Sequence, residues 1–135
     1  MIKVIAFDVG NTITKNGLWL NKDVFRLALR LKKNYKVGLL SNIVKLFSFL
    51  PLYRHIYSSF DKKLVVLSCR VKTKKPKKEI YEIFIKNTGC LPDECLFIDD
   101  RLENILGAEK NGMKNILFTN YKNLIEEMLK LGITV

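Results

Sequence analysis

The 135-residue sequence has no long hydrophobic run, few cysteines and a single histidine. No apolar stretch approaches the roughly 20 residues that cross a bilayer. Asp8 interrupts the first apolar run, where a signal peptide would continue, so we expect a cytoplasmic protein. Three cysteines, an odd number without an export signal, argue against a disulfide framework. One histidine and no cysteine pair at zinc-knuckle spacing leave little for a structural zinc site.

Acidic residues are also scarce. The chain has 13 Asp and Glu against 24 Lys and Arg, and its formal net charge of +11 points to anionic partners. The excess is concentrated in RVKTKKPKK, residues 70–78, which we name the basic segment. Most lysines are expected on solvated faces, but the basic segment can steer an anionic substrate. Nucleic acid is one such partner, although the sequence shows no aromatic platform on which single strands would stack.

The length and the 48% hydrophobic content fit one globular domain, residues 1–135, without repeats or linkers. The residue pattern alternates between strands and helices. Strands are predicted at 3–7, 35–40, 63–67, 96–98 and 115–118, and helices at 21–34, 45–50, 76–88, from 102 towards 112, and around 124–129. Pro51 is expected to stop the second helix. This alternation predicts an α/β fold, a Rossmann-like parallel sheet with helices on both faces.

Polar residues follow three of the predicted strands. They are Asp8, Ser41, Asn42, Asp99 and Asp100, and Lys75 stands at the start of a predicted helix. Ligands of such sheets bind beyond the carboxyl ends of the strands, so these side chains are expected to meet at one edge. Carboxylate and amide oxygens suit Mg²⁺. Taken singly, each residue also has a structural explanation, as a strand-end cap, a turn residue or a solvated lysine.

In this order, the residues resemble the motifs of the haloacid dehalogenase (HAD) superfamily, whose commonest members are Mg²⁺-dependent phosphatases. Residues 7–12, FDVGNT, resemble the first motif, and residues 40–42, LSN, resemble the second. Lys75-Pro76 resembles the third, and residues 97–100, FIDD, resemble the fourth. The resemblance covers essentially the whole chain and is strongest to the glucose-1-phosphatase-like branch. It implies a HAD-like core.

The resemblance implies a nucleophile and a metal site. Asp8 would attack phosphorus and form an aspartyl-phosphate. Mg²⁺ would be held by Asp8, Asp99 and the carbonyl of Gly10, and Asp100 would hold it through water. The Asp99-Asp100 pair favours this metal chemistry over dehalogenation, which uses no Mg²⁺.

The remaining motif residues would contact the phosphoryl group. Ser41, the backbone amide of Asn42, and Lys75 would stabilise charge on the transferring oxygens. Asn104 and Tyr81 also fit the family pattern, but their residue types need no chemistry, and we assign them to packing and turns.

Gly10 departs from the family pattern, which has a second Asp at this position. In the family, that Asp protonates the leaving oxygen and later activates water; such acid-base catalysis is worth roughly 10² to 10⁴-fold in rate, and glycine cannot supply it. Members of the glucose-1-phosphatase-like branch also carry Gly here and are phosphatases. We therefore expect substrates whose leaving group needs little protonation, such as anomeric sugar, acyl or aryl phosphates.

Length is the second departure. Only 28 residues separate Thr12 from Ser41, so no helical cap fits there, and residues 43–74 are predicted to hold only a short helix and a strand. We expect a capless core with an open site, shielded by neighbouring subunits or by a large substrate. The loop 14–20 carries Leu18, Trp19 and Leu20, which are expected to anchor in the core, with a wall of the site as the alternative.

The sequence thus predicts a Mg²⁺-dependent phosphatase acting on a phosphorylated small molecule or macromolecule. The alternative is a catalytically silent HAD-like domain that binds a phosphorylated or nucleic-acid partner through its basic segment.

Overall fold

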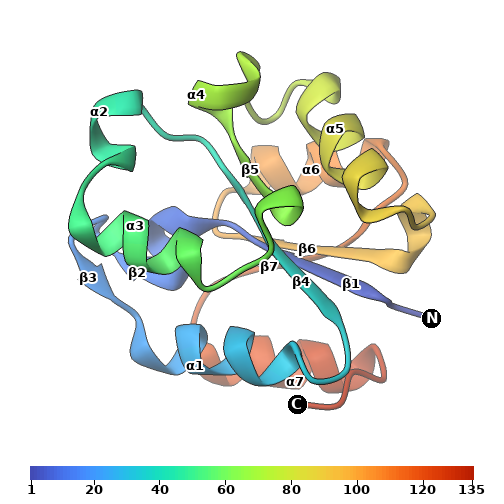
Figure 1. The fold of residues 1–135 in the computed structure, drawn as a ribbon. Helices are drawn as coiled ribbons and strands as arrows, with labels where there is room; N and C mark the ends of the chain where they lie inside the picture. Colours follow the sequence, from blue (N-terminus) through green and yellow to red (C-terminus); the bar gives the residue numbers. More distant parts are fainter.

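A five-stranded parallel sheet forms the centre of the computed structural model, which describes residues 1–135 (Figure 1). The strand order is β5-β4-β1-β6-β7. The bounds are β1 Val4–Phe7, β4 Lys36–Ser41, β5 Val65–Leu67, β6 Cys95–Asp99 and β7 Lys114–Leu117. All four strand pairings are parallel, which confirms the predicted sheet.

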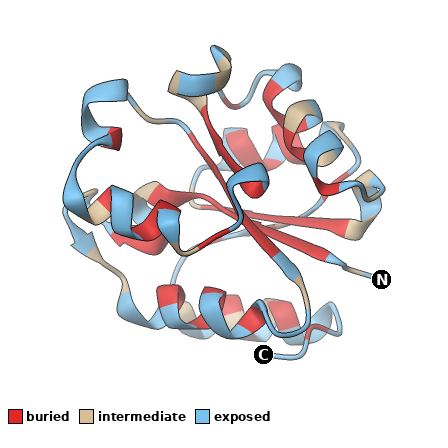
Figure 2. Ribbon diagram, in the orientation of Figure 1, coloured by how far each residue is buried: buried red, intermediate tan, exposed pale blue.

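Helices cover both faces of this sheet (Figure 1). The bounds are α1 Lys22–Leu31, α3 Pro51–Ser58, α5 Lys78–Thr88, α6 Leu102–Lys110 and α7 Tyr121–Lys130. Successive side chains of β1 point to opposite faces: Ile5 and Phe7 pack with α1, α3 and α7, whereas Val4 and Ala6 pack with α5 and α6. The central strand is therefore buried on both faces, as a continuous apolar run predicts (Figure 2). No helix combines the length and the apolar character needed to cross a membrane.

The region between β4 and β5 differs from the prediction. It contains α2 (Lys45–Ser48) and then α3, and Pro51 begins α3 rather than only stopping the helix before it. Proline suits the first turn because it lacks the N–H that has no partner there. A short turn, η2 (Lys62–Leu64), precedes β5, and α4 (Ser68–Val71) follows it. The expectation of one short helix and a strand was wrong.

A small hairpin follows β1, after the turn η1 (Val9–Ile13). Its strands, β2 Thr14–Lys15 and β3 Trp19–Leu20, pair only with each other. Leu18 and Trp19 are 69% and 68% exposed, so the expectation that they anchor in the core was wrong. The hairpin stands outside the main sheet, and of its three large hydrophobic residues only Leu20 packs against the core. Between β1 and α1 the chain holds nothing larger than η1 and this hairpin.

Two helix boundaries also shift. α1 ends at Leu31 rather than at residue 34, and α5 begins at Lys78 rather than at Pro76. The residues around Pro76 form a turn instead, closed by the hydrogen bond that the Lys77 N–H donates to the carbonyl of Lys74. That turn sets Lys75 apart from the helix and lets its side chain reach the sheet edge.

Candidate active site

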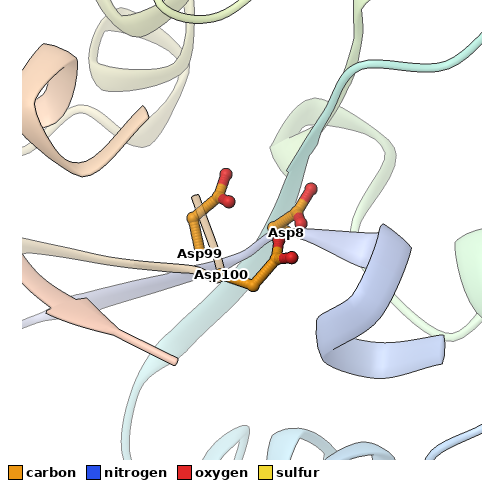
Figure 3. A group of neighbouring side chains, drawn as sticks. All are labelled: Asp8, Asp99 and Asp100. Atoms are coloured by element: carbon orange, nitrogen blue, oxygen red, sulfur yellow. The ribbon is translucent and has the colours of Figure 1, made fainter. Parts of the chain in front are cut away.

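Three carboxylates meet where β1 and β6 end (Figure 3). β1 and β6 are neighbours in the sheet, so Asp8, Asp99 and Asp100 emerge at the same edge. One oxygen of each lies within 4.8 Å of the others. Asp99 is completely buried, Asp8 is 7% exposed and Asp100 is half-buried. The predicted gathering of these residues at one edge is what the structure shows.

Burial and mutual repulsion disfavour the charged form of these carboxylates and raise the pKa of two of them. Burial raises the pKa of Asp8 to about 7, Lys75 opposes that rise, and Asp99 adds to it. The pKa of Asp100 is also raised, first by burial and then by the charge of Asp99. A single ammonium stands against three carboxylates. An oxygen-lined site with this excess of negative charge fits Mg²⁺.

Lys75 lies between two of the carboxylates. Its Nζ donates to Oδ1 of Asp8 at 2.8 Å, to Oδ2 of Asp99 at 2.7 Å and to the carbonyl of Leu40 at 2.8 Å. The residue is only 3% exposed, so it is not one of the solvated lysines. With three partners for three N–H donors, the ammonium is fully bonded and fixes Asp8 and Asp99 relative to each other.

Asn42 holds Lys75 in place through its side chain. Its Oδ1 accepts a hydrogen bond from the Lys75 N–H at 2.8 Å, and its Nδ2 donates to the Lys75 carbonyl at 3.0 Å. The sequence suggested a role for the backbone amide of Asn42 but not this clamp. Ser41 is buried and donates to the Asn42 carbonyl at 3.5 Å. Its hydroxyl therefore has a partner in the adjacent backbone.

Asp99 is held by the Arg101 backbone and by Asn104, which the sequence analysis assigned to packing and turns. Oδ1 accepts from the Arg101 N–H at 2.9 Å, and Oδ2 accepts from Nδ2 of Asn104 at 3.0 Å. The hydroxyl of Tyr81 donates to the Asn104 carbonyl at 2.7 Å. Gly107 makes room for Tyr81, since a Cβ there would lie 2.7 Å from the hydroxyl oxygen. These contacts form a support for Asp99, and the only sequence signal was the position of Asn104 in the helix after FIDD.

A small polar cavity opens above the carboxylates. Its volume is about 180 Å³, and no hydrophobic residue lines it. The lining residues are Asp8, Gly10, Asn11, Asn42, Lys75, Asp100, Arg101 and Asn104. A Cβ built on Gly10 would meet no atom within 4 Å, so a larger side chain fits at this position. The cavity thus has space where the family's second Asp would stand.

Saturating Mg²⁺ is expected to raise the melting temperature of the protein, because a cation that binds only the folded cluster stabilises it by mass action. Asp99→Asn should remove most of this gain. Asp93→Asn, which changes an exposed carboxylate of the same type, should keep it. Differential scanning calorimetry with Mg²⁺ and with EDTA measures the shift. An unchanged melting temperature of the wild type would contradict the metal site.

The sequence matches the family model described as haloacid dehalogenase-like hydrolase over residues 19–112. This match begins after Asp8, so the evidence for the first carboxylate is its position in the structure. Two curated relatives are a hydrolase and a phosphatase by name. Flavin mononucleotide hydrolase 1 of Arabidopsis thaliana is 37% identical over 68 residues, 50% of this chain and 28% of the relative. Glyceraldehyde 3-phosphate phosphatase of Methanothermobacter thermautotrophicus is 34% identical over 87 residues, 63% of this chain and 38% of the relative. The matched region therefore spans less than half the length of either relative.

Solved structures share the fold at low identity. A predicted HAD-like family hydrolase of Porphyromonas gingivalis superposes with a TM-score of 0.77 at 20% identity, covering 100% of both chains. A wild-type HAD family enzyme of Bacteroides thetaiotaomicron, in complex with magnesium and inorganic phosphate, gives a TM-score of 0.71 at 18% identity, covering 92% of this chain and 99% of its own. The similarity covers almost the entire chain, including the edge that carries the carboxylates.

Proposed function

Since the chain belongs to the haloacid dehalogenase-like hydrolase family, we propose that it is a Mg²⁺-dependent phosphohydrolase that acts through an aspartyl-phosphate on Asp8. The observation that carries this proposal is the arrangement of Asp8 and Asp99 around the buried ammonium of Lys75, at the base of a polar cavity. The phosphatase names of the relatives support the same reaction class.

The residues of the cavity have different roles in the proposed reaction. Lys75 bonds Oδ1 of Asp8, so Oδ2 is the oxygen available to attack phosphorus. As the bond from Asp8 to phosphorus forms, the bond from phosphorus to the leaving oxygen breaks. Water then attacks the phosphorus of the aspartyl-phosphate: the new bond to phosphorus forms as the bond to Asp8 breaks, one proton of the water passes to solvent, and phosphate and the Asp8 carboxylate are released. Mg²⁺, held by Asp8, Asp99, Asp100 and the carbonyl of Gly10, would reduce the repulsion between the anionic nucleophile and the phosphoryl group.

Gly10 limits the range of leaving groups. No carboxylate stands at this position to protonate an alkoxide, so the enzyme should prefer aryl, acyl or anomeric phosphates. Gly10→Asp is expected to fold, because its Cβ meets open space and the backbone φ of −62° is ordinary. It should raise kcat for alkyl phosphates by about 10-fold or more and change kcat for aryl phosphates little.

The measurement is a comparison of glycerol 3-phosphate with 4-nitrophenyl phosphate, using the wild type and Gly10→Asp. Gly89→Asp is not a suitable control, because Gly89 has a positive φ of 69° that disfavours other residues. Gly10→Asn is the matched control, since its amide has nearly the shape of the Asp carboxylate and does not act as a general acid. If Gly10→Asp changes both substrates by the same factor, the leaving-group explanation is wrong.

The same glycine supports a second candidate, a HAD-like domain that binds a phosphorylated partner without hydrolysing it. The cavity, which Asn42 and Arg101 line, would then hold a phosphoryl group. Binding of phosphorylated ligands by the wild type, with no hydrolysis by either the wild type or Gly10→Asp, would favour this candidate.

A further inference from the structure

A second cavity lies at the same edge of the sheet, beyond the end of β5. Its volume is about 270 Å³, and its lining residues are Ser68, Cys69, Lys72, Thr73, Lys74 and Lys77. None of the three lysines has a carboxylate within 4.0 Å of its ammonium. We name it the basic cavity. Its positive charge is not neutralised by the protein itself, and it would attract an anion.

One residue of the basic cavity, Thr73, carries an unpaired hydroxyl. The Oγ1 atom of Thr73 is buried and has no hydrogen-bond partner. A buried hydroxyl without a partner is unfavourable, so buried polar groups nearly always find one. A bound anion with several acceptor oxygens would accept from the ammonium groups, and from this hydroxyl once the Thr73 side chain turns towards it. This feature separates the basic cavity from an ordinary solvated lysine patch.

The position of the basic cavity fixes its relation to the active site. β5 lies two strands away from β1, and neighbouring strands are about 4.8 Å apart, so the ends of the two strands are separated by roughly 10 Å. Lys74 of the basic cavity directly precedes Lys75 of the active site. Ser68 accepts from the Ile43 N–H at 2.9 Å, next to Asn42, which clamps Lys75. Residues of the two cavities are therefore adjacent in the chain at Lys74 and Lys75. They are also joined by the hydrogen bond between Ser68 and Ile43.

We propose that the basic cavity binds a second phosphate group of the substrate, roughly 10 Å from the phosphoryl group that is transferred. This inference rests on the proposed function, because it assigns the substrate class to the same site. Phosphate suits the three ammonium groups and the hydroxyl, since it offers several charged acceptor oxygens. The second phosphate can come from a small bisphosphate or from the backbone of a nucleic-acid end. In either case it supplies affinity that a cap would otherwise provide.

The first test compares two pairs of substrates: the members of the first differ only in the second phosphate, and those of the second differ in three further nucleotides with their backbone phosphates. Glucose 1,6-bisphosphate is expected to have a kcat/KM at least 10-fold above that of glucose 1-phosphate, mainly through a lower KM. A thymidine tetranucleotide with a 5′-phosphate, compared with thymidine 5′-monophosphate, tests the nucleic-acid source. A preference for the bisphosphate identifies a small molecule, and a preference for the tetranucleotide identifies a nucleic-acid end. Equal values within both pairs would overturn the proposal while leaving the phosphatase function intact.

Variants of the basic cavity test whether it causes the preference. The ratio measured is kcat/KM for the preferred substrate of a pair divided by kcat/KM for the other member. Lys74→Gln combined with Lys77→Gln should bring this ratio close to one, and Thr73→Val should lower it several-fold. The matched control is Lys110→Gln with Lys114→Gln. It removes the same charge from exposed positions in or next to β7, the outer strand on the side of the sheet away from β5, and should keep the ratio. If the control lowers the ratio equally, general attraction by the net charge explains the preference and the basic cavity does not.

A binding measurement keeps the inference separate from catalysis. Isothermal titration calorimetry of Asp8→Asn with glucose 1,6-bisphosphate and glucose 1-phosphate, and with the tetranucleotide and thymidine 5′-monophosphate, needs no turnover. Asp8→Asn is expected to bind the member of each pair with more phosphate groups more tightly. If adding Lys74→Gln and Lys77→Gln to Asp8→Asn removes this difference in affinity, the basic cavity is supported even if the wild type hydrolyses nothing. Equal affinity within both pairs would overturn it.

Discussion

Asp8→Asn is expected to lower kcat by at least about 10³-fold for every phosphate ester, because the loss of a nucleophile removes the whole covalent route. Asp99 cannot replace it, because it is fully buried and engaged by Lys75, Arg101 and Asn104, and Asp100 is assigned to the metal ion. The variant should fold, since the amide oxygen of Asn can still accept from Lys75.

Steady-state kinetics with 4-nitrophenyl phosphate, together with the melting temperature, checks this expectation. Asp93→Asn, an exposed aspartate outside the cavity, is the control and should retain full activity. Activity of Asp8→Asn within 10-fold of the wild type would rule out Asp8 as the nucleophile.

Lys75→Met is expected to lower both stability and activity strongly. The variant leaves the carboxylates of Asp8 and Asp99 buried without their cation, and breaking a buried pair in this way costs about 3–5 kcal/mol of the free energy of unfolding. Met keeps most of the side-chain volume, so the loss reports charge and hydrogen bonding rather than packing. Mg²⁺ should restore part of the stability, because it supplies positive charge to the same oxygens.

Urea denaturation with and without Mg²⁺ measures this effect. Lys78→Met is the matched control, because the ammonium of Lys78 is exposed and pairs only with the exposed Glu82, so the change in stability should be small. A similar small change for Lys75→Met would mean that the buried ion pairs do not stabilise the carboxylate cluster.

The sequence predicted the sheet and the gathering of the carboxylates because both depend on local patterns. Short apolar runs define the strands, and a polar residue at the end of a parallel strand has one edge at which to lie. The pattern therefore predicts that Asp8 and Asp99 lie close together at the carboxyl ends of the strands, as they do.

The support of the site could not be read from the sequence, because it depends on contacts between distant residues. The Asn42 side chain reaches the Lys75 backbone across 33 positions, and Tyr81 reaches Asn104 across 23. Nothing in the local pattern of Asn42 distinguishes a clamp from a turn residue. The exposure of Trp19 was missed for a related reason: hydrophobicity favours burial, but the hairpin that carries it stands outside the main sheet.

The most direct test of the central claim is the release of inorganic phosphate from 4-nitrophenyl phosphate by the wild type, with Mg²⁺ and with EDTA. Nitrophenolate leaves without protonation, so the assay does not require the proton donor that Gly10 lacks. We predict release that depends on Mg²⁺, stops in EDTA and returns when Mg²⁺ is restored. Release at the same rate in EDTA, or no release with Mg²⁺, would contradict a Mg²⁺-dependent phosphohydrolase.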